Sequence, residues 1–191
     1  YIDGKIQEVY KKEGVLISAH GALIQGIIGV GGEKKGTLKI IENKSDLDKI
    51  DLSSDIVAVI KSFLDYEMYK KINKIGLKGI ICGGIDYESL TKILGYPLGV
   101  AITGSEDVTT VVVTEGFGNI NMSDRTFELL EKYKNSYCSI NGATQIRAGV
   151  MRPEVIINLD FDIENINDNK DESLILVGSK VRIIRDPFFG L

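Results

Sequence analysis

The stretch IVAVIKSFLDYEMYKKINKIGLKGIICGGID, residues 56–86, decides the fold class. Residues 56–60 form a continuous apolar run rich in β-branched side chains, which is typical of a strand buried on both faces. Residues 63–75 carry apolar side chains at the spacing of a helix with one buried stripe, and Gly76 is placed to end that helix. Residues 78–82 form the next strand. This order predicts an α/β protein with parallel strand pairing.

The alternation of strands and helices continues toward the C-terminus. Asp86 is placed to cap a short helix that ends at Gly95, and Ser123 is placed to cap another helix over residues 124–134. Two of the later strands follow each other in the sequence without a long helix between them. Because a parallel pair needs a long crossover connection, we expect a mixed, largely parallel sheet. The further strands are predicted at residues 99–103, 110–114, 136–140 and 154–159.

The beginning of the chain has a different pattern. Short alternating segments are separated by Gly14 and by a glycine-rich turn at residues 31–36, which predicts a small β-barrel or sandwich-like unit. Five segments follow from these patterns: a β-rich unit at 1–42, a polar linker at 43–54, an α/β domain at 55–159, an acidic linker at 160–173 and the start of a β segment at 174–191.

Composition and charge limit the class of protein. The 191 residues are 43% hydrophobic and 26% charged, which is ordinary for a globular chain. Because no apolar run is long enough to cross a bilayer and no signal peptide is recognisable, we expect a soluble, cytoplasmic protein without a membrane partner. The net charge of −4 provides no general attraction to nucleic acid. The chain begins at Tyr1 and stops at Leu191 within a strand-like segment, so both ends are expected to be cuts in a longer protein.

Two cysteines and one histidine limit the chemistry. Cys82 and Cys138 lie in apolar, strand-like stretches, which predicts buried free thiols and fits a reducing compartment. His20 has no serine or cysteine that the sequence places beside it, so a structural role is favoured over that of a general base. Because there is no CxxC pair, no zinc site is expected. No catalytic residue is assigned, and the cofactor, if there is one, stays unknown.

A binding crevice is expected where the predicted parallel strands end. In open α/β sheets ligands bind beyond the carboxyl ends of the strands, and glycines there let backbone amides approach a ligand. The alternative is that these glycines and short polar residues only form turns, as the glycines of residues 26–36 are expected to do. The candidate ligand residues are Gly83, Gly84, Asp86, Thr103, Gly104, Glu115, Gly116, Asn141, Gln145 and Arg147.

The tail of the chain resembles half of a known motif. Residues 178–190, GSKVRIIRDPFFG, resemble the opening half of the KOW motif of transcription elongation factors and ribosomal proteins. Asp186-Pro187-Phe188 stands where that family has Gly-Pro-Phe, and the second half of the motif is missing. The resemblance implies binding of RNA or of other proteins, or a purely structural module, which is the role of many such segments. The candidate nucleic-acid contacts are Lys180, Arg182 and Arg185.

A larger part of the chain resembles an uncharacterised bacterial family. The resemblance runs from AHGALIQG at residues 19–26 through GGID at 83–86 and VTEGFG at 113–118 to INGATQIRAGV at 140–150. Members of that family carry a biotinyl/lipoyl-like sandwich segment before this region and a KOW-like segment after it. The family has no established activity, so the resemblance implies a multi-domain protein and leaves the function open.

Three functional hypotheses remain at this point. The preferred one is a non-enzymatic binding or scaffold protein of unknown specificity, because no catalytic constellation is visible in the sequence. The first alternative is a protein or enzyme that binds an anionic metabolite or nucleotide at the strand ends. The second is an association with RNA or with the transcription or translation machinery through the KOW-like tail.

Overall fold

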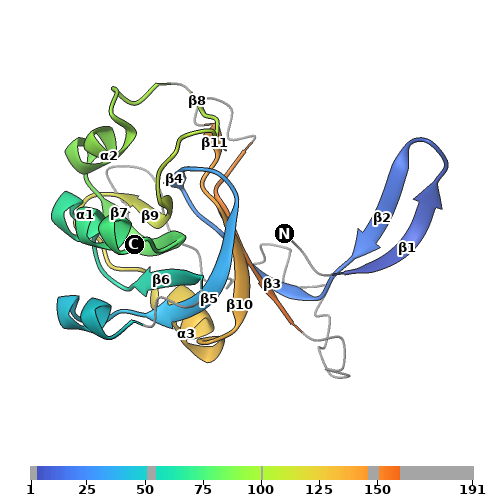
Figure 1. Cartoon of the computed structure of the whole chain (residues 1–191), viewed down its shortest axis with the longest axis horizontal. Helices are drawn as coiled ribbons and strands as arrows, with labels where there is room; N and C mark the ends of the chain where they lie inside the picture. Colours follow the sequence, from blue (N-terminus) through green and yellow to red (C-terminus); the bar gives the residue numbers. More distant parts are fainter. Residues whose placement is uncertain (1–3, 51–54, 100, 146–150, 160–191) are drawn as a thin grey trace, which may run out of the picture. The chain divides into compact units, whose positions relative to one another are not determined.

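An eight-stranded mixed sheet forms the centre of the fold (Figure 1). The structure is a computed structural model that describes residues 4–50, 55–99, 101–145 and 151–159. The strand order is β3-β12-β10-β5-β6-β7-β9-β4, in which β5, β6, β7 and β9 are parallel and the outer pairings are antiparallel. The strands are β3 (Gly21–Gln25), β4 (Ile28–Val30), β5 (Lys34–Ile40), β6 (Ile56–Ile60), β7 (Gly79–Ile85), β9 (Thr110–Phe117), β10 (Tyr137–Asn141) and β12 (Glu154–Asn158). The predicted mixed α/β class is confirmed. The sheet is not largely parallel as predicted, because among the described strands only three of its seven pairings are parallel.

Two apolar layers cover the two faces of this sheet. Alternate residues of β6 face opposite layers: Ile56, Ala58 and Ile60 pack in one, and Val57 and Val59 pack in the other. This alternation explains why the whole strand is apolar. The first layer also contains side chains of η1 (Lys44–Lys49), α1 (Tyr66–Ile75) and α2 (Tyr87–Leu94), and the second contains those of α3 (Asp124–Lys132).

The helix ends follow the predicted start and stop signals. Gly76 and Gly95 adopt the left-handed backbone conformation at the ends of α1 and α2, with φ of 86° and 77°. Asp86 and Ser123 are N-caps, and each side chain accepts a backbone N–H from three residues further on, at 2.6 and 3.3 Å. The first helix begins later than the predicted residue 63 because Asp65 is its N-cap.

Two short sheets lie outside the main one. The first is the hairpin of β1 (Lys5–Tyr10) and β2 (Gly14–Ser18). The second pairs β8 (Ala101–Ile102) with β11 (Thr144–Gln145). A strand over residues 99–103 in the main sheet was therefore a wrong prediction, because among its described residues only Ala101 and Ile102 pair, and their partner is β11.

The topology corrects the predicted segment boundaries. Among the described residues 4–42, only the hairpin forms a sheet of its own, while β3, β4 and β5 belong to the eight-stranded sheet. These residues therefore form no separate barrel or sandwich. The predicted linker at 43–54 is also wrong where it is described, because Leu47 of η1 is 2% exposed in the first apolar layer. Parallel pairing of β5 with β6 joins the two predicted segments directly.

The chain divides into two units, residues 1–159 and residues 160–191. The predicted acidic linker at 160–173 and the KOW-like segment at 174–191 fall in the second unit, which lies outside the described residues. Lys180, Arg182 and Arg185 are part of it, so their proposed contacts with nucleic acid stay predictions.

Candidate functional site

The structure places the predicted ligand residues at two opposite edges of the sheet. Because β10 is antiparallel to β5, its carboxyl end lies beside the beginning of β5, where Ile140 is opposite Lys34. Gly104 lies at this same edge, against Gly32 at the start of β5. The residues at this edge are Thr103, Gly104, Asn141 and Gln145. At the opposite edge, Gly83, Gly84, Glu115 and Gly116 lie in the carboxyl-terminal parts of β7 and β9, and Asp86 directly follows β7. The prediction of one shared rim was therefore wrong. Arg147 lies outside the described residues.

The glycines at the end of β7 face backbone. After β9 the chain crosses the end of β7 on its way to α3, and we call residues 118–122 the crossing segment. Its ends are held by hydrogen bonds from Gly118 N–H to Ile85 O (2.9 Å) and from Met122 N–H to Lys61 O (2.6 Å). A Cβ atom on Gly84 would collide with the carbonyl oxygen of Gly118, and one on Gly83 would collide with the crossing segment as well. These glycines allow close packing of the chain.

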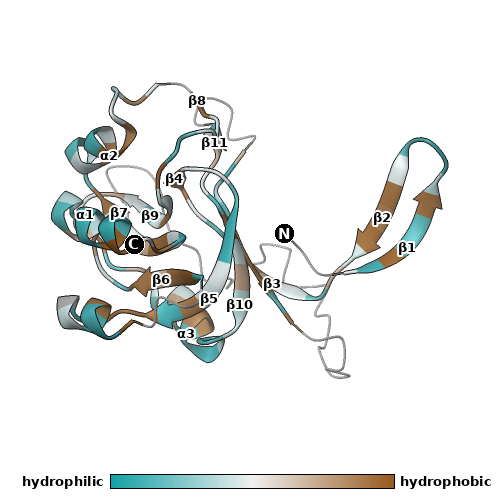
Figure 2. Cartoon of the chain, in the orientation of Figure 1, coloured by the Kyte–Doolittle hydropathy of each residue, from teal (hydrophilic) through white to brown (hydrophobic). Residues whose placement is uncertain are grey.

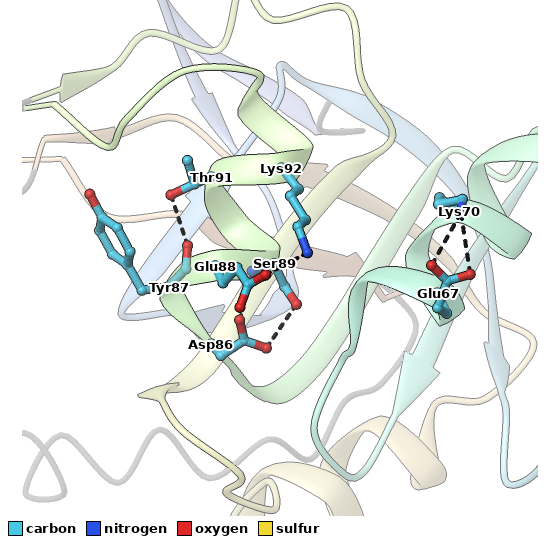
Figure 3. A network of polar contacts seen from close by, with 8 residues as sticks. All are labelled: Glu67, Lys70, Asp86, Tyr87, Glu88, Ser89, Thr91 and Lys92. Carbon is cyan, nitrogen blue, oxygen red and sulfur yellow. Dashed lines mark hydrogen bonds and ion pairs between the residues drawn. The ribbon is translucent and has the colours of Figure 1, made fainter.

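The two carboxylates predicted as ligand residues at this rim, Asp86 and Glu115, accept hydrogen bonds from residues at the N-termini of α2 and α3. Glu115 is 8% exposed, and its Oε1 accepts the Ser123 N–H at 2.7 Å, which is favourable at the N-terminus of α3. Asp86 accepts the Ser89 N–H at 2.6 Å and the Ser89 hydroxyl at 2.7 Å (Figure 3). Burial opposes ionisation of Asp86, but these bonds outweigh it and hold the pKa of Asp86 below its ordinary value.

The opposite edge is also closely packed. The Thr144 hydroxyl accepts the Gly29 N–H at 3.0 Å and donates to the Gly142 carbonyl at 3.0 Å. A Cβ on Gly142 would collide with the carbonyl oxygen of Val30. The side chain of Asn141 accepts an N–H two residues further on, at 3.0 Å, as in an Asx turn. The glycine-bearing turns at this edge pack directly on each other, as Gly104 does on Gly32 and Gly142 on the Val30 carbonyl.

A crevice lies beside the predicted one, at the carboxyl ends of β5 and β6, and β6 is the direct neighbour of β7. Two adjoining cavities of about 350 and 200 Å³ share the side chains of Ile41, Glu42 and Ser62. The larger is also lined by Lys61, Asn121 and Phe127, and the smaller by Phe63, Asp65 and Met68. This is the location that the rule for open α/β sheets favours. Sequence reasoning missed it because the search followed glycines, although Lys61-Ser62-Phe63 directly follows a buried strand.

The lining of the crevice contains apolar side chains together with both acidic and basic ones. The Lys61 ammonium pairs with Asp124 at 3.0 Å and lies 4.8 Å from the centroid of the Phe127 ring. Asp65 caps α1, so its carboxylate is already hydrogen-bonded to the Met68 N–H. Since the ammonium group is paired, the lining does not favour a strongly anionic ligand.

The β1–β2 hairpin carries an apolar face. A bulge at Gln7 shifts the register of β1, so that Ile6 lies opposite Ile17 and Val9 lies opposite Val15. These four aliphatic side chains share one face and are 58, 51, 69 and 49% exposed. Figure 2 shows the hydrophobic stretches of both strands. We call this set, Ile6, Val9, Val15 and Ile17, the hairpin face.

The other side of the hairpin is polar. The Gln7 amide donates to the Ser18 hydroxyl at 2.6 Å, and the Tyr10 hydroxyl donates to the Glu8 carboxylate at 2.8 Å. Leu16 lies on this side, opposite Glu8, and is 49% exposed. The hairpin is therefore amphipathic, although both of its sides are exposed within the described part of the chain.

The two thiols are buried, whereas the histidine is exposed. Cys82 and Cys138 are free and buried, as predicted. Burial raises the pKa of Cys82 strongly and that of Cys138 to about 12, so both stay protonated at neutral pH. His20 is exposed in the connection between β2 and β3 rather than within a strand. Within the described ranges, no three histidine, cysteine or carboxylate side chains are placed to hold a metal ion.

Comparisons with other proteins leave the chain without a family assignment. No family model, no curated protein and no solved structure matches it. In the part of the chain that the structure describes, no helix has both the length and the apolar character needed to span a membrane. The hairpin face and the crevice are the two surfaces of the described chain that suggest a function.

Proposed function

We propose that this chain is a non-enzymatic binding or scaffold protein that docks a protein partner on the hairpin face. The observation that carries the proposal is the exposure of four aliphatic side chains on one side of a two-stranded sheet, between 49 and 69% each. Contiguous apolar patches of this kind mark interaction sites on soluble proteins. An isolated two-stranded hairpin is only marginally stable in water, so a partner that covers this face also stabilises the hairpin.

The distribution of exposed apolar residues supports this choice of surface. Among the described residues, twelve large hydrophobic side chains are exposed, and six of them lie in the hairpin: four form the hairpin face, and Tyr10 and Leu16 lie on its other side. The other six are spread over the rest of the described chain, and single exposed hydrophobic residues need no functional explanation. The polar side of the hairpin has hydrogen bonds of its own, so the apolar side gains most from a partner.

Photo-crosslinking from the two sides of the hairpin tests this proposal. A benzophenone amino acid replaces Val9 on the hairpin face or, as the matched control, Glu8 on the polar side. Both positions are exposed and adjacent in the sequence, so they differ in the direction of the side chain. We expect covalent protein adducts from position 9 and few from position 8. Equal yields from both positions, or no adduct from position 9, would contradict docking on this face.

The crevice supports a second candidate function, the binding of a small polar molecule. Its position at the carboxyl ends of β5 and β6, with an aromatic side chain, a hydroxyl, an amide and a carboxylate in its lining, favours this function. The lining differs from the predicted site residues, and it favours ligands with hydroxyl or amino donors over the anionic metabolite or nucleotide of the first alternative.

Thermal unfolding in the presence of candidate ligands tests the crevice. Neutral sugars, amino sugars, nucleotides and inorganic phosphate are the probes. A ligand at about one hundred times its dissociation constant stabilises the fold by about 2.7 kcal/mol. We expect an amino sugar or neutral sugar to shift the midpoint, and Asn121→Ala to remove that shift. Lys70→Ala is the control, because Lys70 pairs with Glu67 on the exposed side of α1. A shift that persists in Asn121→Ala, or one seen only with phosphates, would count against this assignment.

The remaining hypotheses concern other parts of the chain. Binding of RNA through Lys180, Arg182 and Arg185 depends on the KOW-like tail, which lies outside the described residues. It predicts an affinity that falls steeply with salt concentration. The cytoplasmic location likewise stays a prediction.

A further inference from the structure

We infer that the crevice binds a small molecule that has a protonated primary amine at one end and a neutral, hydroxyl-bearing body. This inference rests on the second candidate function, the binding of a small polar molecule, and names the class of ligand. The ammonium group lies in the smaller cavity and contacts Glu42, whereas the neutral body lies in the larger one.

The two cavities of the crevice differ in charge. The lining of the smaller one contains the carboxylates of Glu42 and Asp65 and no basic side chain. The lining of the larger one contains Glu42 and Lys61, and the Lys61 ammonium is paired with Asp124 at 3.0 Å. A ligand with one cationic and one neutral end therefore matches the crevice in one orientation only, with its amine in the smaller cavity.

Glu42 provides most of the attraction for the amine. The carboxylate of Asp65 accepts the Met68 N–H at 2.6 Å, and the N–H groups at the start of α1 offset part of its charge. In the described part of the chain, no hydrogen bond or ion pair engages the Glu42 carboxylate. Glu42 also lines both cavities, so it lies where they join. An ammonium group supplies the partner that this carboxylate lacks.

The walls of the smaller cavity suit an alkylammonium group better than a metal ion. Ile60, Phe63 and Met68 provide apolar contacts for the methylene group that carries the amine. An ammonium group has three donors, and the two carboxylates and the Ser62 hydroxyl provide acceptors for them. A hard metal ion needs more oxygen ligands, and among the described residues no three histidine, cysteine or carboxylate side chains are placed to hold one.

The larger cavity suits the neutral body of the ligand. Its volume of about 350 Å³ is near the lower limit for small-molecule sites, so the ligand is of about the size of one sugar ring. The Asn121 amide offers both donors and an acceptor to hydroxyl groups, and the Phe127 ring offers an apolar surface. These groups orient the body without requiring a charge on it.

Chemical-shift titration of the isotopically labelled full chain tests the inference with two matched probes. The probes are glucose and the amino sugar in which an ammonium group replaces the exocyclic hydroxyl of glucose. We expect the amides of Glu42 and Ser62 to shift and the amino sugar to bind at least about fivefold more tightly than glucose. Two unit charges about 4 Å apart in water already interact by an amount equal to that factor. Because Glu42 is exposed, this preference should shrink as the salt concentration rises.

Two variants that remove the same charge separate a local contact from the overall charge of the protein. Glu42→Gln keeps the size of the side chain, and it should bind the amino sugar and glucose equally. Glu88→Gln is the matched control, because Glu88 lies on α2 outside both linings and pairs with Lys92 at 2.6 Å. It should keep the wild-type preference. Thermal unfolding confirms that each variant keeps its fold.

The outcomes distinguish the class of ligand from the function of the crevice. If wild type binds both probes equally and Asn121→Ala weakens both, the preference for an amine is wrong and binding in the crevice survives. A preference that persists in Glu42→Gln, or that Glu88→Gln also removes, would overturn the role of Glu42. If neither probe shifts amides that line the crevice, the inference and the second candidate function both fail.

Discussion

The substitution Gly84→Ala tests whether the glycines at the end of β7 serve the crossing segment or a ligand. Gly84 was a candidate ligand residue in the sequence, but in the structure an added methyl group meets the Gly118 carbonyl and lies 3.1 Å from the Ile120 nitrogen. Both contacts are with backbone, which cannot move aside as the end of a flexible side chain does. We expect the crossing segment to shift and the protein to be less stable.

The magnitude follows from the steric conflict and from the unfolded chain. Overpacking a closely packed site costs about 1–3 kcal/mol, and a collision with two backbone groups lies toward the upper limit. Replacing glycine by alanine also restricts the unfolded chain, which stabilises the protein by about 0.4–1 kcal/mol. The expected net loss is about 2 kcal/mol. For a chain of this length, such a loss lowers the unfolding midpoint by about 4–8 °C.

Thermal and urea unfolding measure this loss, with Gly99→Ala as the control. An added Cβ at Gly99 meets no atom within 4 Å, so this variant should be as stable as the wild type or slightly more stable. Amide hydrogen exchange of Gly84→Ala should accelerate at Gly118 and Met122, whose N–H groups hold the crossing segment. A Gly84→Ala protein within about 0.5 kcal/mol of wild type would refute the steric reasoning.

Three further predictions follow from the caps and the core. Asp86→Ala should lose about 1 kcal/mol at neutral pH. The pKa of Asp86 is lower in the folded state than in the unfolded chain, so the greater stability of the wild type is fully present above the ordinary carboxyl pKa of about 4. This difference in stability disappears as the pH falls through the lower folded pKa. Urea unfolding of both proteins from about pH 2 to 7 measures it. Cys82 and Cys138 should resist alkylation at neutral pH until urea unfolds the chain; rapid labelling of the native protein would contradict their burial. Leu47→Ala should lose about 2–5 kcal/mol by calorimetry, whereas a residue in a solvated linker would lose almost nothing.

Local signals in the sequence were sufficient for much of the fold. Glycine at helix ends and aspartate or serine at helix starts depend on a few neighbouring residues, so Gly76, Gly95, Asp86 and Ser123 were assigned correctly. The apolar run of β6 identified a strand buried on both faces for the same reason. The candidate site was predicted less well, because the strand ends were recognised but their order in the sheet was not.

The amino-acid sequence by itself determined most strands of the main sheet, the three α-helices with Gly76, Gly95, Asp86 and Ser123 at their ends, and the burial of both thiols. Each of these depends on propensity and periodicity within one short segment. The tertiary structure decided which strand ends share an edge of the sheet. Because β10 runs antiparallel to β5, Asn141 at its carboxyl end lies at the edge opposite the one where Glu115 lies. It also decided that the hairpin has one apolar side, because the bulge at Gln7 exists only when β1 pairs with β2. Strand direction and register arise from contacts between residues far apart in the chain, and no local pattern contains them.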